Sequence, residues 1–595
     1  GLLKADVVNG RFQRTKETMA KGGAIAIDLA VFNSIQNIAF KKGNAMSNLA
    51  LSGLQRFGLK TLGEVSIDEN VRLAFSPFSQ ISIEADGGIK HQGHIYTAGG
   101  EVKLDGLNNG SVLLASGSSI DVSGRWVNDF SALINGRNPV EAKVIDGGKV
   151  SITSQNKLLL EQGSKIHADG GAHYATARKV MAGEGGSINL TTFSTQNETT
   201  LSFAGADLSA KSLTKNGQLS LTGNQFELGE KSGFDEVTAT NFISADDTLF
   251  SNFSTVSLNA KQDITLTALA DINLTQQNLQ LTGGFFAQQS SQSIKGITQL
   301  KSLPQYLRTS SNLSLFAGNN ISMLQGSSIV TEAGSTVSMT ANKNVFVDGR
   351  ISTPAGKIAL KIDALISGQF ENNQAVWLGE HAELLAKGAV KLNPDPYFRT
   401  GSVEAGGEIS LEAERGYIVI EKGAKLDVSG TATSLDIAIN GLPSNGYQRR
   451  VIGSDAGSIS LIAAEGMALE GKMKGSGGTA ANFSAILSIE LDNGQRNLPD
   501  KVADRITFPT NPLIISVSQN TSERLSNQIA FGDALDTVLT GQVDLYADAL
   551  KQAGLGSLLL KTPDTIQFKG DVDLTVKNTL AMDASLFEWV AKEGQ

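Results

Sequence analysis

Short runs in which apolar and polar residues alternate recur along most of this chain. Residues 99–124 (GGEVKLDGLNNGSVLLASGSSIDVSG) contain three such runs, and the same three runs recur in residues 147–170 and 406–430. Alternation with a period of two is typical of half-buried strands, because successive side chains of a strand point to opposite faces. A unit of this length cannot bury its apolar face alone, so the copies are expected to stack into a β-solenoid.

The copies keep one register. Val112, Leu158 and Ile418 occupy matching positions in the second run, and each lies five residues before a glycine. A slip of one residue would turn core side chains outward, whereas a longer corner only bulges. Residues 89–104 also align without gaps onto residues 345–360, so the repeat extends beyond the clear copies. These alternate apolar side chains are therefore predicted to line the interior.

The pattern divides the chain into four stretches. Residues 1–88 are read as an irregular, β-rich start of the rod, and residues 89–492 as β-helix repeats. Residues 493–556 interrupt the repeats with several prolines and contain one short helix near 534–553, and residues 557–595 resume the strand pattern. Repeats of this kind take precedence over the domain count that length alone suggests.

Three insertions interrupt the repeats, at residues 125–146, 172–184 and 431–455, each directly after the third strand of a copy. Insertions at one corner of a solenoid project from one face, which is often the binding face. The alternative is that they are tolerated loops that fold back over the rod. The candidate ligand-binding residues on them, all expected to be exposed, are Trp126, Tyr447, Arg449 and Arg450, followed by Phe130 and Tyr174.

Composition supports a turn-rich β structure and excludes several kinds of site. The chain has 64 glycines among 595 residues and no cysteine, so disulfides and thiolate metal sites are excluded. The net charge of −9 is spread thinly, without the Lys/Arg cluster that nucleic-acid binding requires. No apolar stretch approaches the roughly 20 residues of a membrane helix, so no transmembrane segment is expected.

The one sequence pattern that suggests a metal site is HxxH, formed by His91 and His94. In the gapless internal match Val347 and Arg350 take these two positions, and no acidic third ligand accompanies the histidines. We therefore predict neither a metal site nor a cofactor.

The aspartates of the DVSG motifs, Asp121 and Asp427, are candidate carboxylates of a polysaccharide-cleaving β-helical enzyme. Asp before Ser-Gly at a strand end is also ordinary turn chemistry, in which the carboxylate binds local backbone N–H groups. His167 occupies the same outward position in a third copy. The sequence shows no concentration of acidic and basic residues in one place, so the structural role is favoured and catalysis is not expected.

The repeated phrase GGxIxLxA…G(A/S)x(I/L)DVSG resembles the rod of filamentous-haemagglutinin-family exoproteins, the large secreted partners of two-partner secretion systems. It is carried by residues 99–124 and 406–430 and less completely by residues 147–171 and 457–478. Residues 547–576 are also similar to a segment of long members of that family. These motifs are architectural, so they specify the fold better than the activity.

The resemblance implies a right-handed parallel β-helix that an outer-membrane partner exports to the surface or surroundings of a Gram-negative cell. The family's N-terminal secretion domain, with its Asn-Pro motifs, is not seen here, so this region is not expected to contact that partner. The first residues, GLLKADVVNGRF, contain neither an initiator Met nor a signal-peptide pattern, and we expect the chain to belong to a longer polypeptide.

We therefore expect the extracellular rod of an adhesin-type structural protein that attaches to host-cell or matrix glycans or proteins, or supports biofilm formation. Two alternatives remain open. The first is a β-helical polysaccharide lyase or glycoside hydrolase, and the second is a passive stalk that presents a downstream toxin domain.

Overall fold

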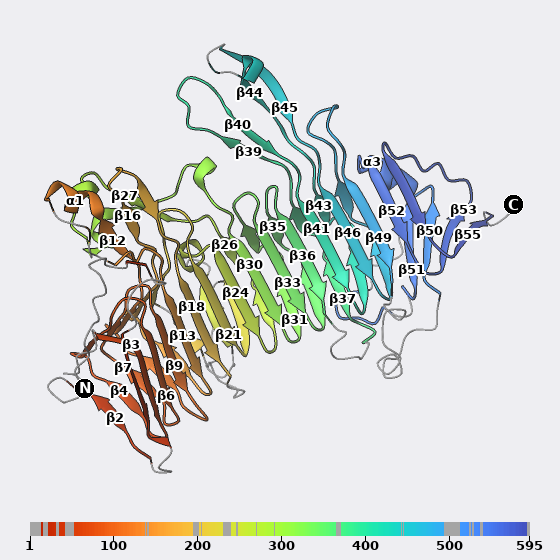
Figure 1. Cartoon of the computed structure of the whole chain (residues 1–595). Helices are drawn as coiled ribbons and strands as arrows, with labels where there is room; N and C mark the ends of the chain where they lie inside the picture. Colours follow the sequence, from red (N-terminus) through yellow and green to blue (C-terminus); the bar gives the residue numbers. More distant parts are fainter. Residues whose placement is uncertain are drawn as a thin grey trace.

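Parallel strands stacked side by side form a long rod, which is the main body of the molecule (Figure 1). In a regular turn, the chain contributes one strand to each of three walls. The predicted all-β parallel β-helix is therefore confirmed. This computed structural model describes residues 14–15, 22–30, 35–41, 53–136, 139, 142–193, 201–203, 205–229, 240–244, 248–268, 270–290, 292–363, 371–441, 443, 446–492, 512–522, 525, 529–535 and 539–591.

The first wall is a single parallel sheet of sixteen strands that runs the length of the rod. Its register is kept from turn to turn, so that Val102 lies beside Val150, which lies beside Ile188. In spatial order the strands are β1 (Gly23–Asp28), β3 (Leu54–Thr61), β6 (Gln80–Ala85), β9 (Glu101–Gly106), β13 (Lys149–Ser154), β18 (Ser187–Thr192), β21 (Gln218–Gly223), β24 (Thr255–Ala260), β30 (Asn312–Ala317), β33 (Thr336–Ala341), β36 (Lys357–Ile362), β41 (Glu408–Ala413), β46 (Ser458–Ala463), β49 (Ile486–Leu491), β52 (Ser557–Lys561) and β54 (Thr579–Asp583).

The second wall consists of a sheet of six strands followed by a sheet of twelve. The first of these sheets contains, in chain order, β2 (Ile38–Phe40), β4 (Val65–Ile67), β7 (Ile89–His91), β10 (Val112–Leu114), β14 (Leu158–Leu160) and β19 (Leu201–Ser202). The second contains β22 (Gln225–Gly229), β23 (Thr240–Ser244), β25 (Ile264–Leu266), β31 (Asn320–Met323), β34 (Asn344–Val347), β37 (Ala375–Leu378), β42 (Tyr417–Ile420), β47 (Gly466–Leu469), β50 (Ile514–Ser518), β51 (Gln542–Tyr546), β53 (Thr565–Lys569) and β55 (Leu586–Val590).

The third wall is built from two shorter sheets. The first contains β5 (Arg72–Ala74), β8 (His94–Tyr96), β11 (Ser119–Asp121), β15 (Lys165–His167) and β20 (Asp207–Ser209). The second contains β26 (Asp271–Asn273), β32 (Ser328–Val330), β35 (Arg350–Ser352), β38 (Glu383–Leu385), β43 (Lys425–Asp427) and β48 (Lys472–Lys474). Strands β7, β8 and β9 thus take the same places as β34, β35 and β36, in agreement with the gapless internal match.

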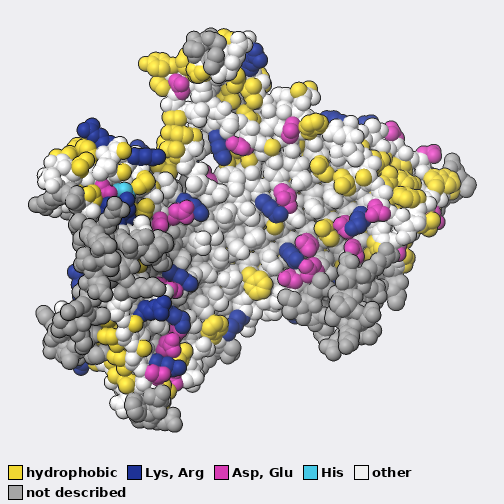
Figure 2. Space-filling view, in the orientation of Figure 1, with side chains coloured by type: hydrophobic (Ala, Val, Ile, Leu, Met, Phe, Trp, Pro, Cys, Tyr) yellow, Lys and Arg dark blue, Asp and Glu magenta, His cyan; other side chains and the backbone are white. Residues whose placement is uncertain are grey.

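Polar side chains alternate with the buried ones and cover the outside of the walls, where acidic and basic residues lie together (Figure 2). Lys357 and Glu408 are neighbours in register in the first wall, and their Nζ and Oε1 atoms lie 2.8 Å apart. Each such exposed pair contributes only about 0–1 kcal/mol. The outer charges therefore add little stability, and the interior must supply most of it.

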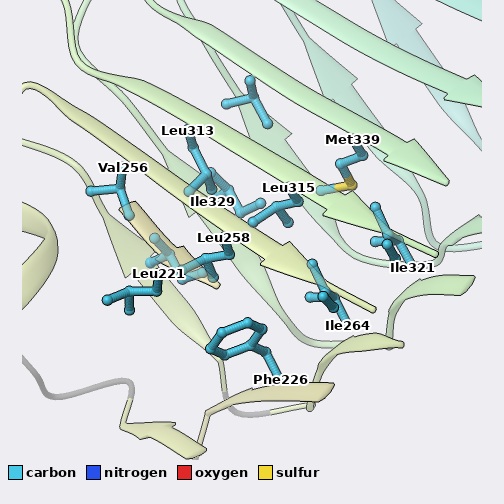
Figure 3. Packing of buried hydrophobic residues seen from close by; sticks show 14 of the residues in the cluster. Leu221, Phe226, Val256, Leu258, Ile264, Leu313, Leu315, Ile321, Ile329 and Met339 are labelled. Atoms are coloured by element: carbon cyan, nitrogen blue, oxygen red, sulfur yellow. The ribbon is translucent and has the colours of Figure 1, made fainter. Parts of the chain in front are cut away.

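Apolar side chains that point inward from the three walls fill the rod (Figure 3). Leu221, Leu258 and Leu315 are successive neighbours in the first wall, and Phe226 and Ile264 are neighbours in the second. None of these five side chains is more than 1% exposed. Burial of such a side chain contributes about 1.5–3 kcal/mol. The three residues that the repeat aligned, Val112, Leu158 and Ile418, are also fully buried.

Glycines directly before the strands of the first wall let successive turns approach closely. A Cβ atom added to Gly457 would lie 1.7 Å from the carbonyl oxygen of Gly407, and one added to Gly407 would lie 1.8 Å from that of Gly356. Real Cβ atoms do not approach backbone oxygens so closely, so a larger residue would push the turns apart. The second glycine of the repeat's GG dipeptide is thus required by backbone stacking, whereas Ala355 and Ala456 stand in the place of the first.

Two turns of the rod depart from the regular plan, and they do so in the same way. In the first, β22 is followed by β23, which returns to the N-terminal side of β22, and the 3-10 helix η3 (Thr248–Asn252) lies against β20 and β26 in the third wall. In the second, β51 returns to the N-terminal side of β50, and helix α3 (Ala547–Gln552) lies against β48. We call these the first and second irregular turns.

The short helix predicted near residues 534–553 is confirmed as α3. Part of that stretch is strand β51 instead, and residues 536–538 lie outside the described residues. Helix α1 (Asp129–Ile134) was not predicted. It begins at Asn128, whose side chain accepts a hydrogen bond from the backbone N–H of Ser131, an ordinary N-cap.

Candidate functional site

Five excursions project from the rod at one corner, between the third wall and the next strand of the first wall. The three predicted insertions lie there, and so do residues 275–310 and 388–405, which the sequence reading did not single out. Their elements group into two projecting bodies, one near the N-terminal part of the rod and one farther along it (Figure 1). The common corner of the predicted insertions is thus confirmed.

The second body, which we call the arm, consists of two antiparallel hairpins. One pairs β39 (Ala389–Leu392) with β40 (Gly401–Glu404), and the other pairs β44 (Ala432–Ala438) with β45 (Tyr447–Gly453). Both extend away from the rod on the same side (Figure 1). At the base of the longer hairpin, the backbone N–H of Ser454 donates to the carbonyl oxygen of Thr431 (2.9 Å). The two ends of the longer hairpin therefore meet where it leaves the rod.

Asp436 joins the two hairpins. Its carboxylate accepts two hydrogen bonds from Arg449 (both 2.9 Å) and one from the backbone N–H of Arg399 (2.8 Å). The backbone N–H of Asp436 in turn donates to the carbonyl oxygen of Arg399 (2.9 Å). The hydrogen bonds from Arg449, followed by the one from Arg399, lower the pKa of Asp436. The two hairpins thus form one unit at neutral pH.

Aromatic rings on the two hairpins stack on each other. The rings of Phe398 and Tyr447 lie 4.1 Å apart between centroids and are inclined by 25°. Tyr397, next in sequence to Phe398, is 86% exposed, and Val451 is 65% exposed. Hydrophobic and basic side chains therefore lie together on the projecting arm (Figure 2).

Three of the four leading candidates lie on the arm. Arg449 and Arg450 are exposed, as expected, whereas Tyr447 is half-buried beneath Phe398, so its expected exposure is wrong. Arg450 donates two hydrogen bonds to the side-chain oxygen of Gln448, at 3.1 and 2.7 Å. The guanidinium groups of Arg449 and Arg450 are therefore held in place by neighbours of the same hairpin rather than extended freely into solvent.

The expectation that Trp126 is exposed is wrong. Trp126 lies in β12 (Arg125–Asn128) and is 0% exposed, and its Nε1–H donates to the carbonyl oxygen of Gln288 (3.2 Å). Its ring stacks on Tyr174, at 6.2 Å and 14°, and meets the edge of Phe285 at 5.8 Å. The reason is that residues 278–301, distant in sequence, cover the insertion. Tyr174 is buried as well and Phe130 half-buried, so the expected exposure of both is also wrong.

These residues form the first projecting body, which we call the cap. Its four-stranded sheet joins β12 to β16 (Ala172–Tyr174), β17 (Val180–Ala182) and β28 (Gln292–Ser293). Arg14 donates two hydrogen bonds to the buried carboxylate of Asp129, and His173 Nε2 lies 2.8 Å from it. Burial alone would raise the pKa of Asp129, but the hydrogen bonds from Arg14 and His173 outweigh this effect and lower the pKa. The cap is a packed structural unit in which Trp126 serves as core.

A charged cluster lies where the cap meets the third wall. His167 is bonded on one side to Asp207 (2.7 Å) and on the other to Lys295 (3.0 Å), and Lys295 lies 3.2 Å from the buried Asp169. The hydrogen bond from His167 lowers the pKa of Asp207 to about 2, and burial lowers the pKa of Lys211 beside it. The sequence shows no such concentration because Lys295 is more than one hundred residues from His167.

The remaining motif residues have structural surroundings. His91 is buried in the core, with Nε2 3.1 Å from the carbonyl oxygen of Ser119, whereas His94 is exposed, so the HxxH pair does not converge. Asp121 and Asp427 each accept a hydrogen bond from the backbone N–H two residues later, at 3.0 and 3.1 Å. Their predicted role in turns is confirmed.

Three further exposed residues of the arm were not predicted, namely Tyr397, Phe398 and Arg399. They follow the Asn-Pro-Asp-Pro sequence at residues 393–396, which ends a strand and begins a turn. Two aromatic residues and an arginine directly after such a turn were the sequence signal from which an exposed binding surface could have been predicted.

Comparison with protein-family models, with curated proteins and with solved structures gives no match to this chain. Among the described residues, no helix is long and apolar enough to cross a membrane.

Proposed function

We propose that this chain is the rod of a large secreted or surface-displayed adhesin of the filamentous-haemagglutinin type, on a Gram-negative cell. Its part would be attachment to host-cell or matrix glycans or proteins, or support of a biofilm. The single observation that carries this proposal is the arm, a rigid pair of hairpins that holds exposed aromatic and arginine side chains away from the rod. Export through an outer-membrane partner would involve another region.

The composition of the arm favours binding. Tyrosine, phenylalanine and arginine are enriched where proteins contact partners, because rigid amphipathic side chains offer large contact areas at low entropic cost. The hydrogen bonds of Asp436 to Arg399 and Arg449, which we call the clasp, fix the arm before a partner binds. The arm therefore loses less conformational entropy when a complex forms. Many copies on one cell would add weak contacts into strong attachment.

The longer hairpin of the arm can be removed without disturbing the rod. Replacing residues 432–453 by Asn-Gly between Thr431 and Ser454 keeps the base pair of the hairpin, because these two residues are already hydrogen-bonded. We expect the shortened chain to lose binding to cells and to glycan or matrix-protein arrays while its β-sheet circular dichroism is retained. Unchanged binding would remove the main support for the proposal.

Point variants provide the matched comparison. Tyr397→Ala and Arg450→Ala should each weaken binding. Tyr306→Ala should not, although Tyr306 is also an exposed tyrosine on an excursion from the same corner. Equal loss in all three variants would indicate a general surface effect rather than a site on the arm.

The alternative of a polysaccharide lyase or glycoside hydrolase rests on the charged cluster around His167. Incubation with acidic and neutral glycans would reveal new reducing or unsaturated ends if the cluster cleaves them, and Asp207→Asn would abolish them. The alternative of a passive stalk for a toxin domain predicts that deletion of this hairpin changes no binding at all.

A further inference from the structure

The two irregular turns are copies of one structural unit. Residues 240–258 align without gaps onto residues 542–560, with β23 on β51, the η3 region on α3 and β24 on β52. The strand pairings agree, since Phe226 lies beside Asn241 in the first unit and Ile515 beside Val543 in the second. In both, a helix stands where the regular plan has a strand of the third wall.

A helix is wider than a strand, about 10 Å against a strand spacing of about 4.8 Å, so the replacement opens a gap beside the last strand of the sheet. In the first irregular turn the chain fills this gap. Leu249, Phe250 and Phe253 are at most 4% exposed and belong to the core. The side-chain amide of Asn252 donates to the carbonyl oxygen of Leu208 on the free edge of β20 (3.0 Å).

In the second irregular turn Leu555, in the place of Phe253, is also buried in the core, but the other equivalent positions do not fill the gap. Lys551 and Gln552, in the places of Leu249 and Phe250, are exposed, and Gly554 stands where Asn252 would be. A pocket of about 480 Å³ lies between α3 and β48. Its walls include the core side chains Leu469, Met473, Leu487, Ile489, Leu545 and Leu550. This volume lies within the range of about 300–1,000 Å³ typical of small-ligand sites.

The charges at the mouth favour an anionic group. Lys472 and Lys474 flank Met473, line the pocket and are exposed. Among the residues that the structure describes, neither of the two has an acidic partner within ion-pair distance. The two acidic lining residues are already engaged.

Asp544 lies 3.3 Å from Lys569, and a carboxylate oxygen of Glu470 accepts a hydrogen bond from the backbone N–H of Leu525 (2.8 Å). An anionic head group at the mouth of the pocket would therefore meet two lysines that have no acidic partner among the described residues, while both neighbouring carboxylates are held by other groups.

We propose that the second irregular turn binds a long-chain fatty acid, with the alkyl tail in the place that Phe250 occupies in the first turn. The carboxylate lies at the mouth beside Lys472 and Lys474. The ligand completes the core of a turn that the described residues leave open, and it stabilises the rod by binding only the folded state.

The test is a fluorescence titration of the full chain, freed of lipid, with cis-parinaric acid. We expect saturable binding of one molecule per chain. Gln552→Phe, which supplies the ring that Phe250 provides in the first turn, should weaken binding by about tenfold or more. Lys551→Ala, on the same helix but outside the pocket, should leave binding unchanged, and circular dichroism should show both variants folded.

A second pair of measurements tests the head group independently of the tail. Lys472→Glu with Lys474→Glu should weaken binding of parinaric acid but not of its methyl ester. Absence of saturable binding, or equal affinity of the wild type and Gln552→Phe, would overturn the proposal. An equal effect of the lysine changes on acid and ester would overturn the assignment of an anionic ligand. The adhesin proposal does not depend on either result.

Discussion

Asp436 and Arg399 bind each other in both directions: the N–H of Arg399 donates to the Asp436 carboxylate, and the N–H of Asp436 donates to the Arg399 carbonyl. This reciprocal pair, with Arg449 on the other side of the same carboxylate, makes one body of two hairpins that are separate in sequence. The geometry of the candidate binding surface therefore depends on Asp436, although Asp436 itself is not expected to contact a ligand.

Replacing Asp436 by Ala should separate the hairpins and leave the rod intact. We expect amide exchange in β40 and β44 to accelerate by about tenfold or more, because the clasp no longer limits local opening. Exchange in the first wall should not change. Because the pKa of Asp436 is lowered in the folded state, the clasp persists at neutral pH and is lost only as pH falls through that lowered pKa. Uniform acceleration along the chain would contradict a local role.

His91 should make its turn of the rod sensitive to acid. Burial lowers the pKa of His91 to about 4, against 6.5 for the unfolded chain. The unfolded state therefore binds more protons between these values, and the folded state loses roughly 3 kcal/mol as pH falls from 6.5 to 4. Valine stands at the equivalent position 347 of another turn, so we test His91→Val. This variant should not show the loss of stability at low pH. Denaturation at pH 7 and pH 4.5 measures it, with His381→Ala, an exposed histidine, as the control.

A methyl group at Gly457 should disrupt the stacking of turns. Gly457→Ala places its Cβ 1.7 Å from a carbonyl oxygen of the previous turn, so the turns must separate. Overpacking of this kind destabilises by about 1–3 kcal/mol or more. Gly283→Ala is the control, because no atom lies within 4 Å of the added Cβ and its φ is not positive. Equal unfolding midpoints for the two variants would contradict the stacking argument.

The buried pair of Arg415 and Glu465 should tolerate joint but not single replacement. The Arg415 Nε–H donates to a Glu465 carboxylate oxygen at 2.8 Å, and neither side chain is more than 1% exposed. At pH 8, Arg415→Met leaves the carboxylate without its cation and should destabilise the chain by about 3–5 kcal/mol. Adding Glu465→Leu should recover most of this loss in a denaturant titration.

The same carboxyl group gives a pH dependence of opposite sign to that of His91. Burial raises the pKa of Glu465 to about 7, against the opposing effect of Arg415. The folded state therefore holds an extra proton between pH 4.5 and pH 7, and its stability declines as pH rises through that window. Glu465→Gln should flatten this part of the stability profile. An unchanged slope would show that the carboxyl group stays ionised in the fold.

The regular turns could be predicted from the sequence because each signal is local. The alternation that places Val112 and Leu158 inside the rod spans only a few residues. Stacking of similar units then brings these side chains into register. The same is true of Asp427, whose turn contact spans two residues. Local signals thus identified the walls and corners.

The bodies that project from the corner could not be predicted in this way, since their contacts join distant parts of the chain. Trp126 has the sequence appearance of an exposed loop residue, and only the return of residues 278–301 buries it. Lys295 reaches His167 across the same interface. No periodicity encodes either contact, and the two copies of the irregular turn became comparable only once their pairing was known.

The uneven continuity of the three walls has a mechanical consequence. The first wall is hydrogen-bonded through all sixteen strands, whereas the third wall stops at β20, resumes at β26 and ends at β48, with helices at the interruptions. Strand-to-strand hydrogen bonds run along the rod, so they resist extension on the first side more than on the third. Under a sideways load the molecule should flex at the two irregular turns, with the unbroken sheet as its spine.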